Sequence, residues 1–169
     1  MSPEAFRTGL ETAWLPARQE IVSTWPLLIV DAAHNVDSAE SLAEALDRLV
    51  PDNESYWLVL GVLRDKDART VLRPLLQHAR GVIVTAPESP RAMPAESLAT
   101  ACYALTDVPV EVAASVADAL GLARERAHGS DGVVVAGSFV TAAEARVALG
   151  LADVLTYEDR VRWLAAGGL

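Results

Sequence analysis

The sequence has little of several features that mark particular classes of protein. Cys102 is the only cysteine among 169 residues, so no disulfide can form within the chain, and a reducing compartment is expected. No apolar run approaches the roughly 18 residues of a membrane helix. Residues 1–11 carry charges where a signal peptide would be apolar. We therefore expect a cytoplasmic protein without a membrane partner, with Cys102 as a small core residue.

Positive charge is also scarce. Lys66 is the only lysine, and 14 basic residues against 23 acidic ones give a formal net charge of −9. Because the chain is so acidic, it has no basic stripe that could contact a phosphate backbone. No nucleic-acid partner is therefore expected. An anionic small substrate would need local positive charge instead. The length and the apolar fraction of 51% favour one packed domain.

Short apolar segments alternate with helical patterns along the chain. Strands are expected at 27–30, 57–60, 82–84 and 133–135, with a weaker one at 108–112, and helices at 39–49, 71–79, 98–105 and 116–127. The strands are apolar throughout, so both of their faces should be buried. This pattern predicts a doubly wound α/β fold with a mostly parallel sheet and helices on both faces. Residues 18–30 predict a short strand, a turn at Trp25-Pro26 and then the strand at 27–30, so the short strand should be the antiparallel neighbour of that strand.

Two further segments carry structural predictions. Pro74 should kink the second helical segment or separate a turn from a helix that begins near Arg73. We expect the domain to span residues 1–150, followed by a tail, residues 151–169, with a possible short helix.

Polar residues directly follow the predicted strands, in the motifs "DAAHN" (31–35), "GVLRDKD" (61–67), "APESPRA" (86–92) and "AGS" (136–138). Ligands of open parallel sheets bind beyond the carboxyl ends of the strands, and these ends share one edge. That edge should carry the candidate site residues, which are Asp31, His34, Asn35, Arg64, Lys66, Arg91 and Ser138.

A purely local role also suits two of these residues. Asp31 could cap a turn and Asn35 could cap the following helix, since both residue types favour such positions. Histidine has no special capping value, and its ring offers a switchable donor or acceptor, so His34 is harder to explain by a local role. No metal site is predicted, because His78 and His128 share no ligand spacing with His34.

Four motifs, in order, resemble signatures of the folylpolyglutamate synthase and dihydrofolate synthase family. They are "DAAHN", "GVLRDKD", "TAPESPRAMPAESLA" (85–99) and "VVVAGSFVTAAEAR" (133–146). The preceding segment, which ends with Arg18 and Glu20, extends the likeness to roughly residues 9–148. The resemblance is to the carboxyl-terminal domain of this family, which is part of the Mur ligase superfamily.

This resemblance implies an ATP-dependent amide ligase that joins glutamate to dihydropteroate, to a reduced folate, or to both, through an acyl phosphate. In the family, ATP and Mg²⁺ are held mainly by an amino-terminal domain with a phosphate loop, and these 169 residues contain no "GxxxxGK[ST]". We expect the chain to be the second domain of such an enzyme, with the ATP-binding domain as its partner and no activity alone.

The resemblance also implies roles for single residues. Asp31 and His34 would be catalytic, and Asp31, Asn35 and Arg18 would bind the nucleotide. Ser138, His34 and Arg91 would hold the incoming glutamate. Neither His34 nor Ser138 is expected in the core, so their alanine variants should lose little stability.

The chain departs from the family pattern at three places. Ala32 and Val36 stand where the family commonly has glycine and proline, and Phe139-Val140 replaces a usual Leu-Tyr. The alanine is conservative unless its position needs a positive φ, and the valine lacks the rigid helix start of a proline.

Two other functions stay open. The first is an amino-acid ligase domain for a peptidoglycan precursor, with the same fold and a different amino-acid pocket, although the "SPRA" and "DKD" loops favour the folate branch. The second is a non-catalytic Rossmann-like binding domain.

Overall fold

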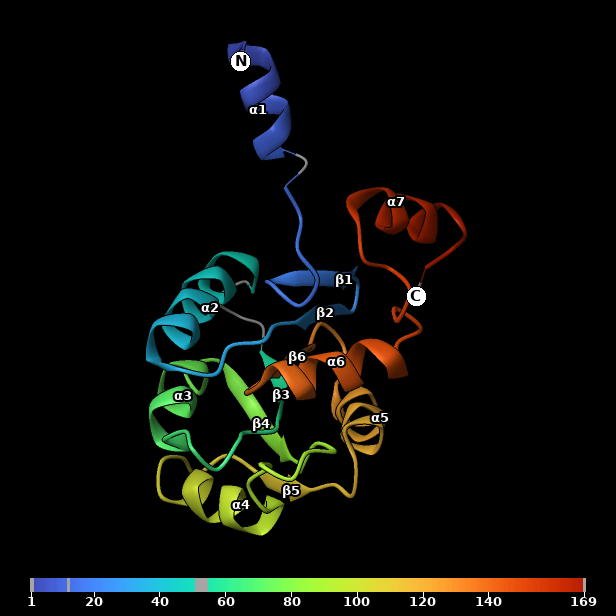
Figure 1. The fold of residues 1–169 in the computed structure, drawn as a ribbon. Helices are drawn as coiled ribbons and strands as arrows, with labels where there is room; N and C mark the ends of the chain where they lie inside the picture. Colours follow the sequence, from blue (N-terminus) through green and yellow to red (C-terminus); the bar gives the residue numbers. More distant parts are fainter. Residues whose placement is uncertain (1, 12, 51–54, 169) are drawn as a thin grey trace.

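The computed structural model describes residues 2–11, 13–50 and 55–168 and contains a six-stranded sheet (Figure 1). In chain order the strands are β1 (Glu20–Thr24), β2 (Leu27–Val30), β3 (Tyr56–Leu60), β4 (Ala79–Val84), β5 (Val110–Val112) and β6 (Gly132–Ala136). Their spatial order is β1-β2-β6-β3-β4-β5. Only the β1–β2 pair is antiparallel among these neighbours. The predicted mostly parallel sheet with one antiparallel strand is thus confirmed.

Helices cover both faces of this sheet (Figure 1). One face packs against α2 (Val36–Leu49), α3 (Ala68–Leu75) and α4 (Ala95–Tyr103), and the other against α5 (Val116–Arg126) and α6 (Phe139–Ala148). Successive strand residues enter opposite cores: Leu58 joins the first and Val59 the second. The predicted doubly wound fold is confirmed.

Two helices lie outside these layers (Figure 1). α1 (Pro3–Glu11) projects from the body, and α7 (Tyr157–Ala165) lies in the tail, where a short helix was predicted. None of the described helices is long and apolar enough to cross a membrane.

The boundaries of α3 differ from the prediction. The helix begins at Ala68, capped by Asp67, and ends at Leu75, with Pro74 in its last turn. It therefore does not begin near Arg73, and it continues only one residue beyond the proline. A proline so close to the end removes one backbone hydrogen bond from the helix, which stops one residue later.

Cys102 lies on α4 and is fully buried. Burial raises the pKa of its thiol to about 11, which keeps the sulfur protonated and unreactive near neutral pH. The predicted core role of Cys102 is confirmed.

Candidate functional site

Asp31 follows β2 at the carboxyl edge of the sheet and is only 4% exposed. Its two carboxylate oxygens accept hydrogen bonds from the backbone amides of Gln19 and Ala33, each 2.6 Å long. Burial raises the pKa of Asp31 above its ordinary value, and these amides, with the charges of Arg18 and His34, offset only part of the effect. Asp31 therefore caps its own turn and also binds the segment before β1, residues 13–19, here called the lead-in.

The lead-in holds Arg18 between two residues in the left-handed region. Ala17 has φ 54° and Gln19 has φ 43°, and such a conformation costs a residue with a side chain on the order of 1 kcal/mol. Hydrogen bonds made by Ala17 offset this conformational cost. The Ala17 amide donates to Glu20 Oε2 (2.8 Å), and the Ala17 carbonyl accepts from the Ala32 amide (2.9 Å). The backbone on either side of Arg18 is thus fixed, while its side chain stays exposed.

Arg18 and His34 meet at the ring of Phe139, the first residue of α6. The Arg18 guanidinium carbon lies 4.8 Å from the ring centroid, and the His34 and Phe139 centroids are 5.1 Å apart with a 45° tilt. Such a contact between a guanidinium and an aromatic ring is attractive. We call Arg18, Asp31, His34 and Phe139 the edge cluster. It joins the lead-in to the loops after β2 and β6.

The His34 ring has a defined tautomer. Its Nδ1 lies 2.8 Å from the carbonyl oxygen of Ala32. A carbonyl oxygen can only accept, so Nδ1 carries the hydrogen, and Nε2 is the acceptor of the neutral ring. His34 is half-buried, in agreement with the expectation that it lies outside the core. The ring is therefore held by the backbone with one nitrogen left for proton exchange.

Asn35 and its neighbours form the start of α2. The Asn35 side chain accepts from the Ser38 amide (2.9 Å) and closes a capping box with Ser38. Val36 begins the helix without help from a proline. Ala32 is not among the described non-glycine residues with a positive φ, so its position does not require glycine. The local capping role of Asn35 is thus present.

Ser138 does not lie where it was expected. The side chain is only 1% exposed, and its hydroxyl accepts from the Thr141 amide (3.0 Å) and bonds the Thr141 hydroxyl (2.8 Å). The expectation that Ser138 lies outside the core is therefore wrong. The cause is the central place of β6, which packs the turn after it against the loop after β3.

Gly137 permits this close packing. It has φ 114°, and a Cβ there would lie 2.5 Å from the carbonyl oxygen of Gly61. The Thr141 hydroxyl donates to that same carbonyl (2.7 Å). The Ser138 hydroxyl is thus part of a tight junction between two loops.

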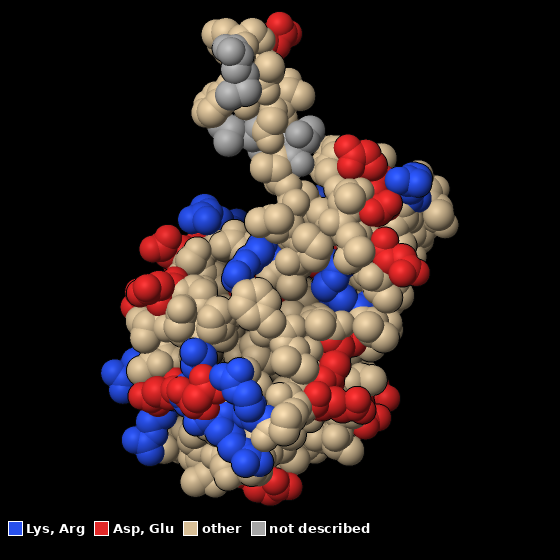
Figure 2. Space-filling model, in the orientation of Figure 1, with Lys and Arg blue, Asp and Glu red and all other residues tan. Residues whose placement is uncertain are grey.

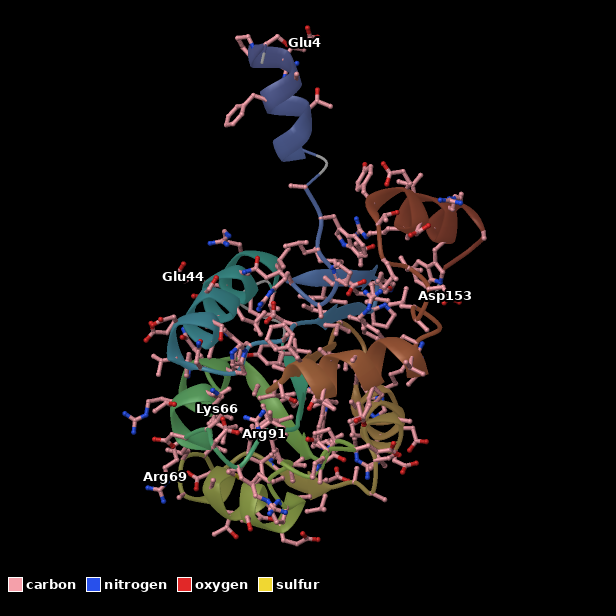
Figure 3. The ribbon with its side chains drawn as sticks, in the orientation of Figure 1. Glu4, Glu44, Lys66, Arg69, Arg91 and Asp153 are labelled. Carbon is pink, nitrogen blue, oxygen red and sulfur yellow. The ribbon has the colours of Figure 1, made fainter. Side chains whose placement is uncertain are left out.

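The other predicted cations form a separate group. Asp65 binds Arg91 (2.8 Å) and Lys66 (3.6 Å), and the Arg64 amide donates to the Arg91 carbonyl (2.8 Å). Figures 2 and 3 show this basic group over α3 and the adjoining loops. Among the described residues, Arg91 contacts the loop after β3 and not the edge cluster. The structure thus gathers Arg18, Asp31 and His34 and leaves Arg91 apart.

Phe139 and Gln19 are the members of this site that sequence reasoning missed. Phe139 was noted only as a departure from the family pattern, and Gln19 acts through its backbone amide, which no residue type reveals. The signal for Phe139 was its place directly after Ser138 at the same sheet edge as His34. The described residues hold no group of three or more His, Cys, Asp or Glu side chains suited to a metal.

The fold and this edge define the class of the protein, a doubly wound α/β domain with a charged site where its parallel strands end. A family model described as "Mur ligase, glutamate ligase domain" matches residues 17–139, which include the whole edge cluster. The chain belongs to this family. The resemblance to the carboxyl-terminal domain of folylpolyglutamate synthases is confirmed.

Two curated relatives illustrate the likeness. The chain is 36% identical over 143 residues to the dihydrofolate synthase/folylpolyglutamate synthase of Escherichia coli, covering 85% of this chain and 32% of that protein. It is also 36% identical over 143 residues to a probable bifunctional folylpolyglutamate synthase/dihydropteroate synthase of Haloferax volcanii, covering 85% of this chain and 17% of that protein. The chain thus spans a third or less of these relatives.

Solved structures agree. Mycobacterium tuberculosis folylpolyglutamate synthase, complexed with ADP and AMPPCP, matches with a TM-score of 0.80 and 32% identity over 87% of this chain and 35% of that one. A bifunctional folylpolyglutamate synthase/dihydrofolate synthase of Yersinia pestis, with Mn, AMPPNP and L-glutamate bound, matches with a TM-score of 0.80 and 35% identity over 89% of this chain and 36% of that one.

Proposed function

We propose that this chain is the glutamate ligase domain of an ATP-dependent enzyme that adds glutamate to dihydropteroate, to a reduced folate, or to both. The observation that carries the proposal is the edge cluster, in which Arg18 and His34 both contact the ring of Phe139 and Asp31 is buried. All four residues lie in the segment that matches the glutamate ligase family.

The edge cluster suits a nucleotide. An exposed guanidinium offers paired donors in a fixed plane, which fit phosphate oxygens. Arg18 is therefore assigned to the phosphates of ATP, and Asp31 to the placement of the lead-in that carries it. ATP supplies the phosphoryl group that activates the substrate carboxylate. Asn35 supports the nucleotide side by fixing the loop after β2.

His34 is assigned to proton transfer. Its Nδ1 hydrogen is held by the Ala32 carbonyl, so Nε2 of the neutral ring can take a proton from the amine of the incoming glutamate. This assignment makes His34 the general base of amide formation. The Phe139 ring fixes the plane of the imidazole.

Ser138 and Arg91 are assigned to the glutamate side in different ways. The Ser138 hydroxyl is committed to Thr141, so Ser138 serves by fixing the amino end of α6, where free amides favour a carboxylate. Arg91 is 64% exposed and supplies a second cation at the same sheet edge, once its ion pair with Asp65 opens. The structure of the Yersinia pestis relative has Mn, AMPPNP and L-glutamate bound.

The remaining parts of the active site are assigned to another domain. The 169 residues contain no "GxxxxGK[ST]", and the curated relatives are about three or more times as long as the matched segment. We assign the phosphate loop and the Mg²⁺ ligands to an amino-terminal ATP-binding domain, without which this chain is expected to be inactive. A buried, protonated Cys102 agrees with a protein that functions in the reducing cytoplasm.

The test is phosphate release from ATP by the complete protein, supplied with glutamate and either dihydropteroate or tetrahydrofolate. We expect release to depend on a pterin substrate and His34→Ala to lower kcat/KM by roughly a hundredfold. His128→Ala is the matched control, because His128 is exposed before β6, at the opposite edge of the sheet. Release that depends on a muramyl peptide precursor and on neither pterin would overturn the proposal.

A further inference from the structure

The tail after α6, residues 151–168, contributes little to the core of the domain. Leu151 and Val154 are buried, but no residue of α7 is, and among the α7 residues only the partly buried Trp163 packs against the second core cluster. Figure 1 shows α7 beside β1 and the lead-in, away from the helical layers. Its contacts with the lead-in therefore need an explanation other than core stability.

Arg146 on α6 makes the first connection between tail and lead-in. Its side chain is 6% exposed and forms an ion pair with Glu20, whose side chain is 3% exposed and also accepts from the Ala17 amide. Its other terminal nitrogen donates to the carbonyls of Leu151 (2.8 Å) and Val154. One buried guanidinium thus joins Glu20, the first residue of β1 and the acceptor of the Ala17 amide of the lead-in, to the start of the tail.

Arg160 on α7 makes the second connection. It donates to the Ile21 carbonyl (3.1 Å), and its guanidinium carbon lies 5.9 Å from the ring centroid of Trp14. The guanidinium of Arg146 lies 5.8 Å from the same ring. Trp14 in the lead-in therefore lies near two arginines, Arg146 on α6 and Arg160 on α7.

Arg160 and Arg18 also line the same hollow. An open cavity of about 430 Å³ is bordered by Trp14, Arg18, Gln19 and Arg160, among others. Arg18 stands between the two left-handed residues of the lead-in, so its direction depends on how the lead-in is held. Arg160 contacts Trp14, before Arg18 in sequence, and Ile21, after it, so Arg160 restrains the chain on both sides of Arg18.

We infer that Arg160 of the tail is a positioning residue, which holds the lead-in so that Arg18 faces the nucleotide. The assignment of Arg18 to the nucleotide rests on the proposed function, whereas the hold on the lead-in does not. The chain supplies a matched control in Arg162, on the same helix, which bonds within α7 to Asp159 (3.0 Å) and the Glu158 carbonyl.

The first measurement is hydrogen exchange by mass spectrometry on peptides that cover residues 13–22, in Arg160→Ala and Arg162→Ala proteins. We expect the amides of Ala17 and Gln19 to exchange about tenfold faster in Arg160→Ala, because the lead-in opens more often. Arg162→Ala should match the unmodified protein. Equal exchange in the two variants, or faster exchange spread equally over β6, would overturn the inference.

The second measurement is steady-state kinetics of the complete ligase. Arg160→Ala is expected to raise KM for ATP about tenfold while kcat stays within about twofold, because fewer molecules hold Arg18 in its binding position. A fall in kcat with an unchanged KM would overturn the assignment of Arg160. Exchange does not require catalysis, so an unmodified protein without ligase activity would refute the proposed function and leave the hold on the lead-in standing.

Discussion

Replacing Ser138 by alanine separates two roles for its hydroxyl. The structure uses the hydroxyl to cap α6, where it accepts from the Thr141 amide at a position only 1% exposed. A hydroxyl that instead contacts glutamate would be free of the helix. We expect Ser138→Ala to lower the free energy of unfolding, as the capping geometry requires.

The magnitude follows from burial. Losing an N-cap side chain costs about 1 kcal/mol in a typical helix. A buried donor left without a partner costs about 1–3 kcal/mol, because water cannot replace the lost acceptor. Both figures describe the same lost bond to the Thr141 amide, so they are not added, and burial places the expected loss near 2 kcal/mol. For a domain of this size the melting temperature should fall by about 6 °C.

Ser115→Ala is the matched control. Ser115 caps α5 in the same way, accepting from the Asp118 amide (3.1 Å), but at a more exposed position. Water can reach the amide that this change frees, so the loss should be about 1 kcal/mol or less. Urea unfolding of both variants and of the unmodified protein gives the two losses directly.

The comparison can refute the reasoning in one step. If Ser138→Ala loses no more stability than Ser115→Ala, the buried cap is not what the hydroxyl supplies. A raised KM for glutamate in the complete enzyme, with an unchanged urea midpoint, would instead show that the hydroxyl binds the substrate.

Two further predictions concern buried charges. Glu20→Gln and Arg146→Met should each cost about 3–5 kcal/mol in urea unfolding, and the double variant less than their sum; additive losses would show that the pair does not couple. Burial raises the pKa of Asp131, but hydrogen bonds from Ser55 and Arg80 outweigh it and hold the pKa below its ordinary value. Its stabilisation is present above about pH 4 and lost as the pH falls through the lowered pKa. The deficit of Asp131→Asn should therefore shrink below pH 4, and a deficit independent of pH would contradict this.

The alternation of apolar strands and helical segments was sufficient to predict the sheet, because a strand that is apolar on both faces must be covered on both faces. The antiparallel first strand followed from the short segment before Trp25-Pro26. Pro74 was misjudged because a proline near a helix end costs only one backbone bond, and the end of α3 depends on its packing.

The sequence by itself determined which residue types stand at the carboxyl edge, since Asp31, His34 and Ser138 directly follow apolar strands. It also determined the family, through several motifs in order. The chemical groups of a side chain are set by its residue type and do not depend on the fold. These inferences could therefore be made without knowing which side chains lie next to one another.

Only the tertiary structure decided which of these residues meet. Placing β6 beside β2 brings Phe139 to His34 and buries Ser138, and no local pattern encodes that strand order. The lead-in reaches Asp31 through the backbone amide of Gln19, which every residue except proline possesses. Contacts made by backbone groups and between distant segments depend on the fold, and these contacts turn a row of polar residues into a site.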